Sequence, residues 1–97
     1  MREAFVARYR TTAEGAEENQ RLVEAVYAEL AQSRPEGLQY ATFRLDDGVT
    51  FVHVAVGGEG VLPELPAFQE FQRELGARLD GRPLEGSNAR LVGRYQS

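Results

Sequence analysis

The stretch LQYATFRLDDGVTFVHVAV, residues 38–56, decides the fold of this chain. Its two halves, 38–45 and 49–56, are rich in β-branched and aromatic residues, and Asp46-Asp47-Gly48 separates them. Such runs on either side of an Asp-Gly pair predict a β-hairpin. A two-residue type I′ turn centred on Asp47 and Gly48 places Asp46 opposite Val49, which sets the register of the two strands.

That register divides the side chains of the hairpin into two faces, because successive residues of a strand point to opposite sides. One face carries the opposed pairs Phe43–Val52, Ala41–Val54 and Leu45–Thr50. The other carries Thr42–His53, Arg44–Phe51 and Tyr40–Ala55. The first set is mostly apolar and suits helices, and a one-residue slip would mix the two sets. His53, the only histidine in the chain, is therefore expected on the face that points away from the helices.

Alternation and helical periodicity predict the remaining elements on either side of the hairpin. We expect a strand at 3–10, a helix at 16–33, a second helix at 67–79 and a final strand at 89–95. The order β-α-β-β-α-β with right-handed crossovers favours an α+β, ferredoxin-like fold. Its antiparallel four-stranded sheet has the order 4-1-3-2, with both helices on one face. The length predicts a single domain over residues 1–97.

Composition excludes several classes of protein. The absence of cysteine excludes disulfides and a cysteine-based zinc site. A lone histidine without spaced carboxylate partners gives no metal site. A net charge of −4 without a basic block argues against nucleic acid as a partner. No apolar run reaches the roughly 20 residues of a membrane span, and we expect a cytoplasmic protein.

The outer face of the predicted sheet carries too much apolar surface to remain in water. Phe51, Tyr40 and Ala55 lie on it, together with Val6 from the first strand and Val92 from the last. A second copy related by a two-fold axis would cover this surface. We therefore expect a homodimer formed through the sheet face.

Residues 35–56, P-E-G-L-Q-Y-A-T-F-R-L-D-D-G-V-T-F-V-H-V-A-V, resemble the P-x-G-x-x-Y…R…D…F-V pattern of the antibiotic biosynthesis monooxygenase-like group. PAFQEFQREL is similar to that group's second helix. The resemblance implies a ferredoxin-like fold that dimerises into an α/β barrel, often with a ligand cavity inside. Some members oxidise polyaromatic substrates without a cofactor, and others degrade haem with a histidine on the second helix. GGEGVLPELPAF has no histidine, so haem degradation is not expected and no cofactor is predicted.

Two functions follow from these observations. The first is an uncharacterised small-molecule-binding protein that acts as a cofactor-independent oxygenase on an aromatic or acidic metabolite between the sheets. The second is a non-catalytic, stress-type or accessory homodimer whose sheet face is only an interface. A ligand-sized space between the sheets would distinguish the two.

The candidate site of the first function lies on the predicted outer face. His53 is its catalytic base, and the ligand-binding residues are Arg8, Tyr40, Thr42, Arg44, Phe51 and Arg94. The arginines would hold negative charge and the aromatic rings would stack on the ligand. The alternative for His53 is packing at the dimer interface, hydrogen-bonded to Thr42 or water. The arginines can equally form salt bridges or reach solvent, and the aromatic side chains can simply fill the interface.

Overall fold

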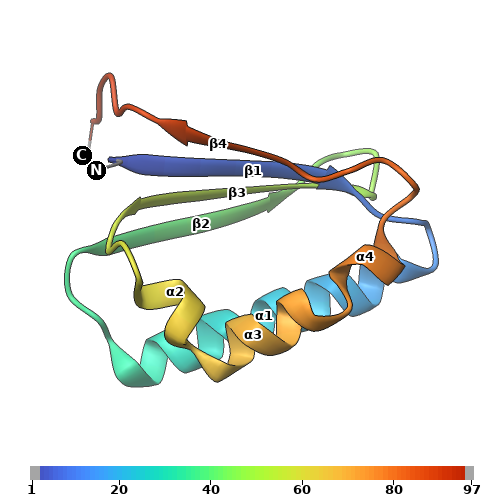
Figure 1. Cartoon of the computed structure of the whole chain (residues 1–97), viewed down its shortest axis with the longest axis horizontal. Helices are drawn as coiled ribbons and strands as arrows, with labels where there is room; N and C mark the ends of the chain where they lie inside the picture. The colour runs from blue at the N-terminus through green and yellow to red at the C-terminus, as the bar shows by residue number, and fades with distance from the viewer. Residues whose placement is uncertain (1–2, 96–97) are drawn as a thin grey trace.

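The computed structural model describes residues 3–95, so residues 1–2 and 96–97 of the predicted domain lie outside the described part. Its elements are β1 (Ala4–Arg10), α1 (Gly15–Ser33), β2 (Leu38–Arg44), β3 (Thr50–Gly57), α2 (Val61–Glu64), α3 (Pro66–Arg73), α4 (Leu75–Arg78) and β4 (Glu85–Ala89). The strands form one antiparallel sheet in the order β2-β3-β1-β4. Figure 1 shows the helices gathered beneath one face of that sheet. The predicted α+β class and strand order are confirmed.

The register of the β2–β3 hairpin is the predicted one, although its turn is not. Thr42 pairs with His53 as expected. Within residues 3–95, Arg34 is the only non-glycine residue with positive φ, so Asp47 does not adopt the type I′ conformation. Of the two predicted central residues, only Gly48 has a positive φ, at 79°. The Asp47 carboxylate accepts hydrogen bonds from the backbone N–H groups of Val49 and Thr50, and these bonds hold the loop.

The predicted placement of His53 on the outer face is wrong, because the β1–β3 pairing puts it beneath the sheet. His53 pairs with Ala7, and Arg8 pairs with Val52. Directly opposed residues share a face, so His53 lies on the same side as Tyr9, which is buried against the helices. The apolar set that includes Phe43 and Val52 consequently faces away from the helices. The prediction assigned the more apolar set to the helix side. The polar groups can lie there instead because they hydrogen-bond to one another.

The C-terminal third differs from the prediction in two places. The expected helix 67–79 is divided into α3 and α4, because Glu74 leaves the helical region with φ of −125° and ψ of 29°. The final strand is residues 85–89, not 89–95: Glu85 pairs with Arg8 and Ala89 with Ala4. Residues 90–95 continue without regular structure. Their strand-like sequence pattern therefore has no partner strand within the described chain.

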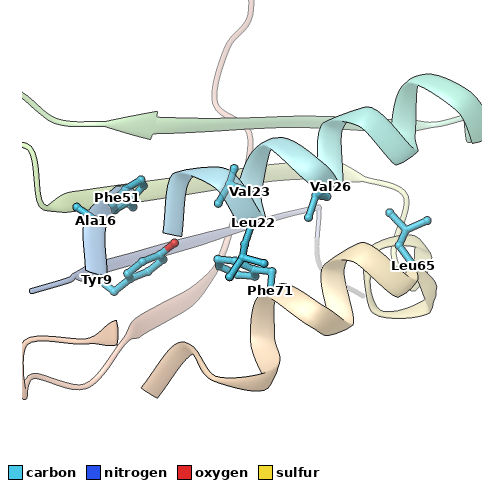
Figure 2. Close-up of a cluster of buried hydrophobic side chains, with 8 residues drawn as sticks. All are labelled: Tyr9, Ala16, Leu22, Val23, Val26, Phe51, Leu65 and Phe71. Carbon is cyan, nitrogen blue, oxygen red and sulfur yellow. The ribbon is translucent and has the colours of Figure 1, made fainter. Parts of the chain in front are cut away.

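The hydrophobic core fills the space between the sheet and the helices α1 and α3. Figure 2 shows its members, which are Tyr9, Ala16, Leu22, Val23, Val26, Phe51, Leu65 and Phe71. Phe51 and Val26 are each 1% exposed, and burying a side chain of this kind stabilises the fold by about 1.5–3 kcal/mol. The Tyr9 ring stacks on Phe51 at 5.7 Å. The core therefore holds Tyr9 rigidly from one side.

Candidate functional site

His53 lies at the centre of a buried group of polar side chains. Its side chain comes from β3 and the residue is 7% exposed. The Nε2 atom lies 2.7 Å from the hydroxyl of Tyr9 on β1, and Nδ1 lies 2.6 Å from the hydroxyl of Tyr40 on β2. The Thr42 hydroxyl lies 3.3 Å from Nδ1. Two neighbouring strands, β1 and β2, thus hold both ring nitrogens of an imidazole carried by β3.

A cavity of about 290 Å³ opens in front of this group, between the sheet and the helices. Phe68, Phe71 and Leu75 line it from the helix side, and Phe5 lines it from the sheet. The Tyr9, Tyr40 and His53 side chains form its polar end. Ligand pockets have volumes of about 300–1,000 Å³. The space is therefore just below the lower end of that range and suits a small, flat, mainly apolar molecule with one polar end.

A second layer of polar groups supports Tyr9 from α1 and α4. The Asn19 side chain is fully buried, and its Nδ2 donates to the Tyr9 hydroxyl at 2.9 Å. The Arg78 Nε donates to Asn19 Oδ1 at 2.9 Å, and the guanidinium also donates to the Phe71 carbonyl at 2.7 Å. Burial lowers the pKa of Arg78. A buried cation thus ends a hydrogen-bonded chain that leads to the imidazole.

On the other side, Tyr27 and Thr42 complete the group. The Tyr27 hydroxyl lies 2.8 Å from the Thr42 hydroxyl, and its ring stacks on Tyr40 at 5.2 Å. Burial lowers the pKa of His53 to about 4. Burial also raises the pKa of Tyr9 to about 12 and raises the pKa of Tyr40. At neutral pH the imidazole is therefore uncharged and both phenols keep their protons.

Solved structures with the same architecture identify the fold. Protein Rv0793 from Mycobacterium tuberculosis aligns over 96% of this chain and 97% of its own, with a TM-score of 0.71 and 18% identity. A structure described as an antibiotic biosynthesis monooxygenase aligns over 93% and 98%, with a TM-score of 0.71 and 13% identity. A mutant of SnoaB, a cofactor-independent oxygenase from Streptomyces nogalater, aligns over 97% and 96%, with a TM-score of 0.67 and 19% identity. The chain has the antibiotic biosynthesis monooxygenase fold. No family model and no curated protein matches the sequence.

The structure gathers only part of the predicted site. Tyr40 and Thr42 lie beside His53. Phe51 is on the same side of the sheet but packs in the core. Arg44 lies over Phe51 at 5.6 Å. Its guanidinium pairs with Glu17 at 3.0 Å and so does not line the cavity.

The predicted wall of three arginines is wrong. Arg8 is exposed on the outer face of the sheet, opposite to the face that carries His53. Arg94 is exposed in the segment beyond β4. Arg44 is on the helix side, where Gln20 and the Gly48 carbonyl accept its hydrogen bonds. The polar end of the cavity is consequently formed by neutral side chains.

Asn19 and Arg78 are site residues that the sequence reasoning missed. A signal was present for Asn19, because it lies three residues after Ala16 and three before Leu22, on the apolar stripe of its helix. A buried amide on such a stripe requires a partner. Arg78 follows Phe71 by two helical turns in the sequence, on the side that faces the core.

Within residues 3–95, no three histidine, aspartate or glutamate side chains gather in a way that can hold a metal ion. None of the helices in the described chain is both long enough and apolar enough to cross a membrane.

Proposed function

We propose that this chain binds a flat aromatic molecule in the cavity between sheet and helices and oxidises it with O₂ without a cofactor. One observation carries the proposal: an apolar cavity of about 290 Å³ has a polar end at which His53 contacts the Tyr40 and Tyr9 hydroxyls. Such a cavity holds an aromatic ring system by its faces and one oxygen atom by a hydrogen bond. The shared fold with an oxygenase described as cofactor-independent supports the choice of reaction.

The proposed reaction converts an activated methylene into a carbonyl. The substrate loses two hydrogens, one oxygen atom of O₂ becomes the new carbonyl oxygen, and the other leaves as water with those two hydrogens. An electron-rich enolate can reduce O₂ directly, so the substrate itself supplies the electrons. The protein would hold the substrate oxygen, keep bulk water away and stabilise the enolate through the Tyr40 hydroxyl.

His53 is the proposed catalytic residue, although its low basicity and the contacts of both its ring nitrogens with tyrosine hydroxyls limit its role. A group with a pKa of about 4 that accepts a proton from a methylene only as acidic as an ordinary phenol, with a pKa of about 10, does so at a cost of roughly 8 kcal/mol. This observation favours a second candidate function, in which the cavity binds the molecule without chemistry. In that case Tyr40 and His53 serve only to recognise the ligand.

Anthrone, a tricyclic ketone with one activated methylene, tests both functions. We expect the chain to bind anthrone and to accelerate O₂ uptake, with anthraquinone formed in equal amount above the protein-free rate. His53→Gln should reduce turnover by tenfold or more while the fold is retained, and Arg90→Gln on the exposed surface is the matched control. Binding without accelerated uptake would select the second function. The absence of any binding to this or smaller aromatic ketones would refute both.

We also propose that two copies pack sheet to sheet, through a set of residues that shares only Val6 and Val92 with the predicted one. The outer face carries Val6, Val52, Val54 and Phe43, and Phe43 is 55% exposed. Beyond β4, Val92 is 96% exposed in the isolated chain. Surfaces of this kind favour a partner. Light scattering at micromolar concentration should give the mass of a dimer, and Phe43→Asp should give a monomer; a monomeric parent protein would contradict the proposal.

A further inference from the structure

The buried chain of hydrogen bonds that runs from α4 to the cavity has a fixed direction at one end. A guanidinium has only donors. Arg78 therefore requires that Asn19 present its Oδ1, at 2.9 Å from Nε. The reversed amide would set Nδ2 against Nε, donor against donor. The Asn19 amide is consequently oriented with Nδ2 toward Tyr9.

That orientation determines what Tyr9 can do. The Tyr9 oxygen accepts from Asn19, so its one hydrogen is available for His53 Nε2 at 2.7 Å. If Nε2 carried the proton instead, the Tyr9 hydrogen would have no acceptor among the bonds of this buried group, which is an unfavourable arrangement. The uncharged imidazole therefore carries its proton on Nδ1. At the opposite end, Tyr27 and Thr42 are hydroxyls that can donate or accept, so they impose no direction.

We infer that Arg78 sets the hydrogen-bond polarity of the whole array, so that Tyr40 offers its hydrogen to a ligand and the cavity selects a molecule with an acceptor oxygen. The Nδ1–H of His53 donates to the Tyr40 oxygen at 2.6 Å. What Tyr40 has left is its own hydrogen, which it gives to the neighbouring Thr42 or to a ligand. A ketone, quinone or phenolate oxygen matches that donor. Arg78 is thus a positioning residue that never touches the ligand. The choice of ligand rests on the proposed function, whereas the polarity of the array does not.

The first part of the test determines which ring nitrogen carries the proton in the only histidine of the chain. Nitrogen-15 correlation spectra at neutral pH should show an unprotonated Nε2 and a protonated Nδ1. Asn19→Asp should reverse this, because the carboxylate accepts from both Arg78 and Tyr9, and the Tyr9 oxygen then accepts from a protonated Nε2. Arg78→Met should give a mixture of the two tautomers. Asn88→Asp, at an exposed position of β4, is the matched control and should leave the tautomer unchanged.

The second part compares two ligands of one size, 1,4-naphthoquinone and 1-naphthol, by the shift of the His53 resonances. The quinone offers only acceptors and the naphthol offers a donor. The chain contains neither cysteine nor lysine, so these common sites of covalent quinone addition are absent. The parent protein should prefer the quinone. Asn19→Asp should change the affinity ratio by about fivefold toward the naphthol, which corresponds to one hydrogen bond.

Each outcome decides a separate claim. A protonated Nε2 in the parent protein, or an unchanged tautomer in Asn19→Asp, would overturn the polarity assigned to Arg78. A reversed tautomer with an unchanged affinity ratio would overturn the ligand class while leaving the cavity as a binding site. If neither ligand binds, the binding function and the ligand class both fail, and the tautomer still reports on the polarity.

Discussion

Acidification should destabilise this protein through His53. The pKa of His53 is lowered from 6.5 to about 4, because the imidazolium would lose its hydration in the buried site. Above pH 6.5 the side chain is uncharged in both the folded and the unfolded chain. Between pH 6.5 and about pH 4 the unfolded chain binds a proton that the folded chain does not. Stability therefore falls as the pH decreases through this window, and below it His53 contributes no further change.

The size of the loss follows from the width of the window. A difference of one pKa unit corresponds to 1.36 kcal/mol, so a shift from 6.5 to about 4 corresponds to about 3 kcal/mol of unfolding free energy. Since His53 is only 7% exposed, screening by water reduces this figure little. Small domains have about 5–15 kcal/mol in total. Acidification to pH 4 would thus remove a substantial part of the stability.

Urea unfolding at intervals between pH 7.5 and pH 4 measures this quantity, with an NMR titration of the single imidazole in parallel. The parent protein should lose about 3 kcal/mol across the window, and His53→Gln should show a much flatter profile. Asp47 does not interfere: hydrogen bonds from Thr50 and Val49 lower its pKa from 3.8 to about 2, so its contribution is lost only at lower pH. A native imidazole that titrates near pH 6.5, or equal slopes in the two proteins, would refute the reasoning.

Three further substitutions test the buried polar network, the hairpin turn and the core beside the cavity. Tyr9→Phe leaves the Asn19 amide and the imidazole Nε2 without a partner and should cost about 1–3 kcal/mol for each group in urea unfolding, whereas Tyr95→Phe at an exposed position should cost nothing; equal effects would contradict the buried network. Gly48→Ala should cost about 1–2 kcal/mol as measured by thermal unfolding, because φ is 79° although a Cβ meets no atom within 4 Å. Phe71→Ala should destabilise by about 3–5 kcal/mol and enlarge the cavity, and tighter binding of bulkier aromatic probes by this variant would report that enlargement.

The sequence was sufficient for the strand order, which follows from the element order and right-handed crossovers. It was also sufficient for the register of the hairpin, although the type I′ turn used to predict that register is absent. The sequence was not sufficient to predict which face of the sheet carries His53. Both sides of β3 carry apolar residues, and the choice depends on its pairing with β1, where Ala7 meets His53. That contact joins strands more than forty residues apart in the chain, beyond the reach of a local pattern.

The prediction of the final strand failed for a different reason. The sequence ARLVGRY alternates and contains the strand-favouring residues Val92 and Tyr95. EGSNA contains no β-branched or aromatic residue, yet β4 is EGSNA. Backbone hydrogen bonds to β1 select the segment that lies in the right place, whatever its side chains favour. The Asn19 and Arg78 partnership was equally hidden, because the two residues are separated by 59 positions.

The central strand β3 has a consequence for regulation. His53 points into the cavity, while its neighbours Val52 and Val54 lie on the outer face that we assign to the second copy. A ligand that shifts β3 therefore also shifts the surface on which two chains would meet. Such coupling is reciprocal: the factor by which the ligand changes the dimer association constant equals the factor by which dimerisation changes ligand affinity. Ligand binding in the cavity and dimerisation would then be thermodynamically coupled, because β3 carries side chains to both sites.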